Sequence, residues 1–397
     1  MCVKSARCSL CWLFIYLASG SCWAEFSGQL AIELRTFSQD AQYPHQLEGL
    51  QTSMMLEPEW RSYLSDNLQT ALIPYLRLDA RDTKRTHADL REAYVLYIQN
   101  DWELLVGFNR EFWGVTEARH LVNIINQVDA VENIDEEDYL GQLMLNLTLQ
   151  RDYGRFSFYL MPLFRERTFG GEKGRLRTRL IVDQDAVEYE HKDEQWHTDI
   201  AFRYSHYLGD WDIGLSLFHG TSREPRLILN NQQNALLPYY DQVSQLGAEL
   251  QYTQDAILWK FEGLARAGQG HTFLASVVGF EYTLFQVFDS AADIGFLLEH
   301  LYDGRDMVKA PANTFDNDLF LGVRYSLNDV QDTALLAGML RDLQNKASSL
   351  RLEAERRVGD SMKLELETQL FINASKDILA TSFKKDNFFT VRLSQYF

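Results

Sequence analysis

Hydrophobic and polar residues alternate along most of the chain, most clearly near its C-terminus. Leu364 and Leu366, for example, alternate with Lys363, Glu365 and Glu367. A period of two places the two kinds of residue on opposite faces of a β-strand, whereas a helix would spread these charges on all sides. Repeated along the chain, the pattern predicts eighteen strands, with sixteen as the alternative count: 26–37, 51–63, 68–79, 88–99, 101–109, 139–151, 155–164, 195–207, 210–219, 242–253, 256–267, 272–285, 290–302, 318–327, 332–343, 347–358, 361–373 and 388–397.

The connections between these strands alternate in length. Every second connection is a tight turn rich in Gly, Asn and Asp, which are residues that hairpins favour. The intervening connections are long, except for 268–271 and 344–346. This parity is typical of a transmembrane antiparallel up-and-down β-barrel with periplasmic turns and outer loops. The prediction is therefore an all-β chain with one barrel domain at 25–397. The long connections are 38–50, 80–87, 110–138, 165–194, 220–241, 303–317 and 374–387.

The two ends of the chain carry export signals. The last strand ends on Phe397, a terminal aromatic residue that predicts recognition by barrel-assembly machinery. Residues 1–24 combine basic residues, a short apolar stretch and a small-residue cleavage site after Ala24, as a secretory signal peptide does. The alternative is a lipoprotein processed at Cys22, but the aliphatic residue expected three positions before the cysteine is missing.

Composition narrows the class of protein. All four cysteines lie within 1–24, so the exported chain would have no disulfide and no cysteine metal site. Removal of 1–24 takes away two basic residues and leaves 36 basic and 56 acidic residues, a net charge of 36 − 56 = −20. Such an acidic chain is a poor candidate for nucleic-acid binding. The expected location is the outer membrane, with membrane lipid and lipopolysaccharide as partners.

Connection 110–138 differs from an ordinary outer loop. Thr116 is a candidate helix N-cap, and Leu121, Ile124, Ile125 and Val128 recur at helical spacing. An apolar stripe of this kind needs a wall to pack on, and the barrel interior offers one. The prediction is an inserted helical loop in or over the lumen. The alternative is an extracellular helix that covers a loop.

At this segment the chain resembles an uncharacterised family of Gram-negative outer-membrane β-barrels, a domain of unknown function with porin-like organisation. Trp113-Gly114, Glu117, Ile125-Asn126 and Asp129 match the family pattern of Trp-Gly followed by Ile-Asn-x-x-Asp. The resemblance implies an architecture and names no substrate.

Charged residues are sorted between two neighbouring segments. The tail of the inserted segment is acidic, and the following long connection is basic. If both reach the lumen, they would set a transverse field across a pore. The alternative is two solvated outer loops that bind divalent cations or lipopolysaccharide phosphate. The acidic residues are Asp129, Glu132, Asp135, Glu136, Glu137 and Asp138, and the basic ones are Arg165, Arg167, Lys173, Arg175, Arg177 and Arg179.

The sequence therefore predicts a porin-like channel for an unknown small solute, without cofactor or metal. Its constriction is assigned to Phe112, Trp113, Glu117, Leu121, Ile125, Asn126 and Asp129, facing Arg165, Arg167, Arg175, Arg177 and Arg179. A structural or assembly barrel of an export system is the main alternative. An outer-membrane enzyme is less favoured, because the chain has neither a Gly-x-Ser-x-Gly nor a His-Glu-x-x-His motif.

Overall fold

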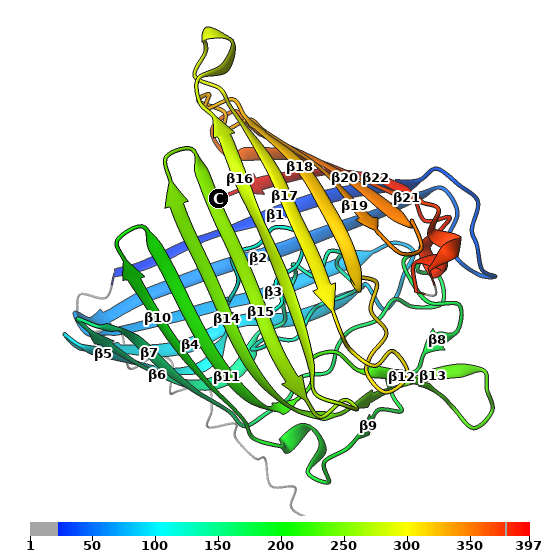
Figure 1. The fold of residues 1–397 in the computed structure, drawn as a ribbon, viewed down its shortest axis with the longest axis horizontal. Helices are drawn as coiled ribbons and strands as arrows, with labels where there is room; N and C mark the ends of the chain where they lie inside the picture. The colour runs from blue at the N-terminus through cyan, green and yellow to red at the C-terminus, as the bar shows by residue number, and fades with distance from the viewer. Residues whose placement is uncertain (1–22, 378) are drawn as a thin grey trace, which may run out of the picture.

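The computed structural model describes residues 23–377 and 379–397. Positions 1–22 of the predicted signal peptide lie outside the described residues, and strand β1 begins at Trp23. Eighteen antiparallel strands form one sheet that closes into a barrel through the pairing of β1 with β22 (Figure 1). The barrel strands are β1 (Trp23–Phe37), β2 (Leu50–Ser65), β3 (Leu68–Asp79), β4 (His87–Ile98), β5 (Trp102–Asn109), β6 (Gln142–Arg151), β7 (Gly154–Met161), β10 (Asp199–Leu208), β11 (Trp211–Thr221), β14 (Gln242–Gln254), β15 (Ile257–Ala267), β16 (Phe273–Leu284), β17 (Asp293–Asp303), β18 (Asn317–Ser326), β19 (Ala334–Asp342), β20 (Ser348–Val358), β21 (Met362–Ile372) and β22 (Phe388–Tyr396).

The predicted fold class and strand count are confirmed. Short turns gather at one end of the barrel and the long connections at the other, as Figure 1 shows. The long-loop end carries a second, small sheet that the sequence did not predict, formed within the connections expected to be loops. Its strands are β8 (Ile181–Val182), β9 (Glu188–Tyr189), β12 (Arg226–Leu229) and β13 (Ala235–Tyr240).

Helical structure in residues 23–377 and 379–397 is limited to short 3-10 turns. They are η2 (Glu194–Trp196), η3 (Val287–Asp289), η4 (Ala374–Lys376) and η5 (Ala380–Phe383). Across the described ranges, no helix has the length and apolar character needed to cross a bilayer.

The strands have an apolar outer face and a polar inner face. On β1, Leu30, Ile32 and Leu34 are exposed, whereas Ala31 and Glu33 between them are buried, as is the following Arg35. The last strand repeats the pattern, because Leu393 is exposed and Thr390 is buried. Alternation with lipid on one side and the lumen on the other produces this pattern.

Exposed aromatic residues collect near the short-turn end. Tyr97 contacts Trp102, and Trp211 stacks on Tyr252. Phe397 completes this group at the closing seam, where its backbone exchanges two hydrogen bonds with Gly28. A belt of this kind is typical of the interface between a membrane and water.

Proline 74 shapes the inner wall. Pro74 has no N–H to donate, and the register between β3 and β4 shifts between Ile73 and Pro74, so that Arg91 becomes the extra residue of a β-bulge. The bulge changes the alternation locally. Arg91 and Glu92, which are neighbours in sequence, therefore both face the lumen, where Arg91 pairs with Asp129 and Glu92 pairs with Arg61.

The assignment of the lipid face predicts the effect of a charge at Leu321, which is exposed in the middle of β18. Leu321→Arg should destabilise the folded barrel by roughly 2–4 kcal/mol, because the guanidinium would enter the apolar part of the bilayer. Equilibrium unfolding in lipid vesicles measures this difference. Leu321→Ala is the control, since it shortens the side chain without adding charge. Equal effects of the two substitutions would contradict the assignment.

Candidate functional site

The inserted segment is the candidate site. Residues 110–141 join β5 to β6 and fold into the lumen without a helix, so the helical part of the predicted loop is wrong. The physical reason lies in the backbone donors. A helix starting near Thr116 would bond the Val122 N–H to the carbonyl four residues earlier, but that N–H is donated to Glu262 of the barrel wall.

Glu262 of β15 is completely buried and holds the first part of the segment. Its carboxylate accepts hydrogen bonds from the backbone N–H groups of Val115 at 2.7 Å, Thr116 at 3.0 Å and Val122 at 3.2 Å. The Thr116 hydroxyl also lies 2.7 Å from this carboxylate. One wall residue thus satisfies three amides, two of them of buried residues and one of a half-buried residue, and each would be costly to leave without an acceptor.

Glu299 of β17 accepts backbone hydrogen bonds from the next residues in the same way. Its two carboxylate oxygens accept from the backbone N–H groups of Glu117 and Ala118, each at 2.8 Å. The Glu117 side chain then reaches Arg324 of β18 at 2.7 Å. Residues 115–122 are consequently fixed against the β15–β18 wall.

Apolar contacts seal the segment to the wall as well. Trp113, Val122, Ile124 and Ile125 pack into a buried cluster with side chains from β5 to β14. Leu121 points the other way, into a cluster contributed mainly by β15 to β18. The apolar residues therefore pack on the barrel wall as predicted, although they do so without helical geometry.

The acidic tail of the segment meets arginines of the opposite wall. Asp129 pairs with Arg91 at 2.7 Å, and Glu132 pairs with Arg77 at 2.6 Å. Burial by itself would raise the pKa of Asp129, but hydrogen bonding from His87 and the positive charge of Arg91 outweigh burial and lower this pKa to about 2. Asp129 is therefore anionic, and the tail is anchored to β3 and β4.

His87, Asp129 and Glu132 have ligand atoms within 4.8 Å of one another, as a metal site would require. However, the guanidinium groups of Arg77 and Arg91 already neutralise the two carboxylates. The arrangement is satisfied as an ion-pair network, and its donor set does not favour a metal.

A third group of contacts fixes the segment to strands β20 and β21. Asp135 pairs with Arg351 of β20 at 2.7 Å, and Asn133 donates to Glu367 of β21 at 2.9 Å. The polar contacts of segment 110–141 thus reach the barrel wall at β15–β18, at β3–β4 and at β20–β21.

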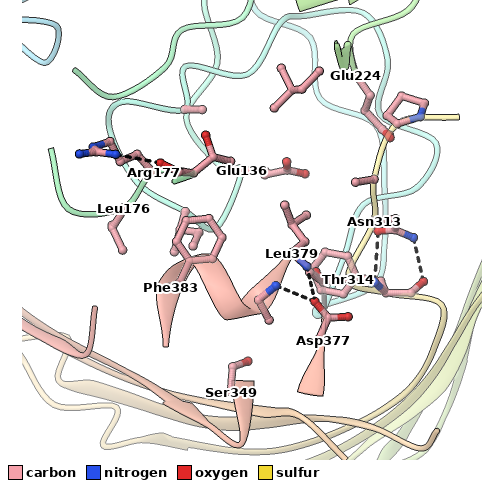
Figure 2. A pocket seen from close by; sticks show the side chains of 18 of the residues that line it. Glu136, Leu176, Arg177, Glu224, Asn313, Thr314, Ser349, Asp377, Leu379 and Phe383 are labelled. Atoms are coloured by element: carbon pink, nitrogen blue, oxygen red, sulfur yellow. Dashed lines mark hydrogen bonds between the residues drawn. The ribbon is translucent and has the colours of Figure 1, made fainter. Parts of the chain in front are cut away.

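Two adjoining cavities follow the side of the lumen bounded by β18 to β21. Their volumes are about 520 Å³ and 210 Å³. Figure 2 shows the larger one, into which Leu379 and Phe383 project. The two cavities share several lining residues from the inserted segment, the outer loops and the wall, among them Arg119, Asp135, Glu224, Ser349, Arg351 and Gln369.

Glu224 links the outer loops to the inserted segment. Its carboxylate lies 2.6 Å from Arg305, 3.4 Å from Arg266 and 3.5 Å from Arg119. Burial would raise the pKa of Glu224, but the three positive charges hold it well below its usual value. Arg119 of the inserted segment is in this way tied to the loop that carries Arg305.

The predicted constriction residues divide into two groups. Glu117, Leu121 and Asn126 line the smaller cavity. The others line neither cavity: Trp113, Ile125 and Asp129 are buried in contacts, and Phe112 is half exposed against the His120 ring.

The predicted arginines also separate. Of these arginines, only Arg167 forms an ion pair with the acidic tail of the inserted segment in the described residues, and its partner is Glu136. Arg165 pairs with Asp89, and Arg175 pairs with the buried Asp386. Arg177 donates to backbone carbonyls, and Arg179 is exposed. Arginines of the barrel wall, rather than this series, oppose the acidic tail.

Sequence reasoning missed Glu262 and Glu299 as site residues. A signal was present, because each is a carboxylate at an inward strand position beside an inward apolar residue, Leu264 for Glu262 and Leu297 for Glu299. What these carboxylates bond to depends on a segment more than 130 positions away in the chain.

Removal of the Glu262 carboxylate should release residues 115–122 from the wall. Glu262→Ala leaves three N–H groups without an acceptor, at about 1–3 kcal/mol each. Hydrogen exchange of 115–122 should become faster in the purified barrel. Glu355→Ala, which removes a carboxylate paired with Lys363, is the control and should leave this exchange unchanged. Unaltered exchange in the Glu262 variant would contradict the anchoring role.

Acid should weaken the anchoring of Asp129. Because its folded-state pKa lies below the usual value, the carboxylate stabilises the fold above about pH 4, and this contribution is lost as the pH falls toward 2. Thermal unfolding in detergent at pH 5 and pH 2.5 should show a loss on the order of 2 kcal/mol that Asp129→Asn lacks. Parallel losses in both proteins would exclude Asp129 as the titrating anchor.

Comparisons with known proteins identify proteins that have a similar fold. No protein-family model matches the chain, and no curated protein sequence matches it. Among solved structures, a BenF-like porin from Pseudomonas fluorescens Pf-5 is similar with a TM-score of 0.55 at 10% identity, covering 95% of this chain and 98% of that one. OccAB1 of Acinetobacter baumannii is similar with a TM-score of 0.54 at 6% identity, covering 94% and 96%. The chain has the fold of porin-like outer-membrane barrels.

Proposed function

We propose that this protein is an outer-membrane channel for small solutes, narrowed by segment 110–141. The long-loop end would face the outside of the cell, and the short turns would face the periplasm. Solutes would pass along the β18–β21 side of the lumen, through the two adjoining cavities. The resemblance to a family of uncharacterised outer-membrane barrels is compatible with this role and remains a prediction.

The observation that carries the proposal is the three-sided attachment of the inserted segment. An eighteen-stranded barrel has a wide interior unless something fills it. Here the anchors at Glu262, Asp129 and Asp135 hold the segment across that interior and leave the β18–β21 side lined by cavities. A fixed constriction beside an open path is what a selective pore requires.

The lining of the path favours polar solutes that fit closely. Arg119 and Arg351 lie beside Glu224 and Asp135, so both signs of charge are present along the shared part of the two cavities. Paired charges of this kind keep water ordered and offer both donors and acceptors to a solute. An enzymatic role has less support, because Asp129, Glu132 and Asp135 of the segment are engaged in structural ion pairs.

Single-channel recording in planar bilayers tests the proposal. The intact protein should give discrete steps, and replacement of 115–122 by a short Gly-Ser linker should enlarge them roughly twofold or more, because the pore widens. Shortening the exposed hairpin tip at 230–234 is the matched control and should leave the steps unchanged. A barrel that stays silent in both the intact and the linker-replaced forms would favour a structural or assembly role.

A further inference from the structure

The larger cavity has an unusual lining for the mouth of a polar channel. Apolar side chains from separate loops and from β19 surround it: Phe169, Leu176, Leu180, Phe315, Leu340 and Phe383. Figure 2 shows Leu379 and Phe383 projecting into it from the η5 turn and the residue before it, with Leu176 close to Phe383. With a volume of about 520 Å³, the cavity falls in the size range of small-ligand sites.

Four of the five arginines that line this cavity have carboxylate partners. Arg351 pairs with Asp135 at 2.7 Å, and Arg119 lies 3.5 Å from Glu224. Arg167 and Arg226 also have acidic partners, Glu136 and Asp241. Arg177 is buried, and its guanidinium donates to backbone carbonyls of the surrounding loops. Little positive charge is left to attract an anion.

The carboxyl groups at the β18–β19 side have no cationic partner among the described residues. Asp318 and Asp342 line the cavity directly opposite each other on paired strands, and both are more than nine-tenths buried. Among the described residues, neither has an ion-pair partner. Asp318 accepts only from the Asn317 N–H, and Asp342 only from the N–H groups of Gln344 and Asn345. Two like charges directly opposite each other destabilise a sheet.

One oxygen of each carboxylate is free of protein donors. No donor of the described residues reaches Oδ1 of Asp318 or Oδ2 of Asp342. Asp377 lines the same cavity, and its bonds come from neutral donors, the backbone N–H groups of Leu379 and Ala380 and the Asn345 side chain. An apolar chamber with uncompensated buried carboxylates at one side is complementary to an apolar body that carries a cation.

We propose that this cavity binds an amphipathic organic cation, a protonated amine attached to a compact apolar group. The ammonium would lie against Asp318 and Asp342, and the apolar group against Phe315, Leu379 and Phe383. This inference names a substrate class for the proposed channel. It rests on the proposed function only in treating the bound amine as a solute of the channel. A bare divalent cation would satisfy the carboxylates but would leave the apolar lining in contact with water.

Isothermal titration of the purified barrel in detergent provides the test. The probes are cyclohexylmethylammonium, the matched anion cyclohexanecarboxylate, the small cation ethylammonium and Ca²⁺ alone. Cyclohexylmethylammonium should bind saturably at one site, and each of the other three should bind at least about tenfold more weakly. Equal or tighter binding of the carboxylate, of ethylammonium or of Ca²⁺ would overturn the proposal. This ranking uses the unaltered protein and so does not depend on any variant folding.

Two substitutions locate the site. Asp318→Asn and Phe383→Ala should each weaken binding of cyclohexylmethylammonium about tenfold, because one removes the charge and the other removes apolar contact. Asp332→Asn is the control, since this aspartate is exposed at the opposite end of the barrel, beside Arg357. Heat-modifiable migration on gels verifies that each variant is folded. Unchanged binding in both folded variants would overturn the assignment.

The outcome is separable from that of the proposed function. A barrel that conducts but does not bind the amine would refute this inference and leave the channel intact. A barrel that binds the amine with the predicted ranking but does not conduct would support the site and refute the channel.

Discussion

The arrangement of this protein depends on hydrogen bonds between the backbone of one segment and carboxylates of the barrel wall. Residues 115–122 carry N–H groups into the lumen without forming a helix, and buried amides without acceptors are costly. Glu262 and Glu299 supply those acceptors. The segment is consequently fixed to the wall by its main chain, so its position does not rely on any one of its own side chains.

The opposite attachment uses charge, and it depends on a proline. The bulge beside Pro74 turns Arg91 inward, where it meets Asp129. Breaking such a buried pair would leave an uncompensated charge, which costs more than the intact pair contributes. The segment is thus held by neutral donors on one wall and by ion pairs on the other. Both attachments use carboxylate acceptors, so acid can weaken either of them.

The remaining side of the lumen has a different character. Along β18 to β21 the cavities are bounded by apolar loop residues and by carboxyl groups such as that of Asp318, which has no cationic partner in the part of the chain that the structure describes. Elsewhere in the interior, buried charges are mostly paired, as Glu33 is with Arg77 and Arg85. Buried charges that are paired within the protein stabilise the barrel. Buried carboxyl groups without a cationic partner, as in this cavity wall, remain available to a bound solute.

The sequence by itself determined the barrel, because a period of two and alternating connection lengths are local properties of the chain. The eighteen strands followed from them, as did the placement of Glu367 on the face opposite to Leu366. The apolar content of 110–138 likewise indicated a buried segment. Only the tertiary structure decided that Val122 would donate to Glu262 instead of to its own helix, and that Arg91 instead of Arg175 would meet Asp129. These partners are distant in sequence, and periodicity carries no information about which distant groups closure of the barrel brings together.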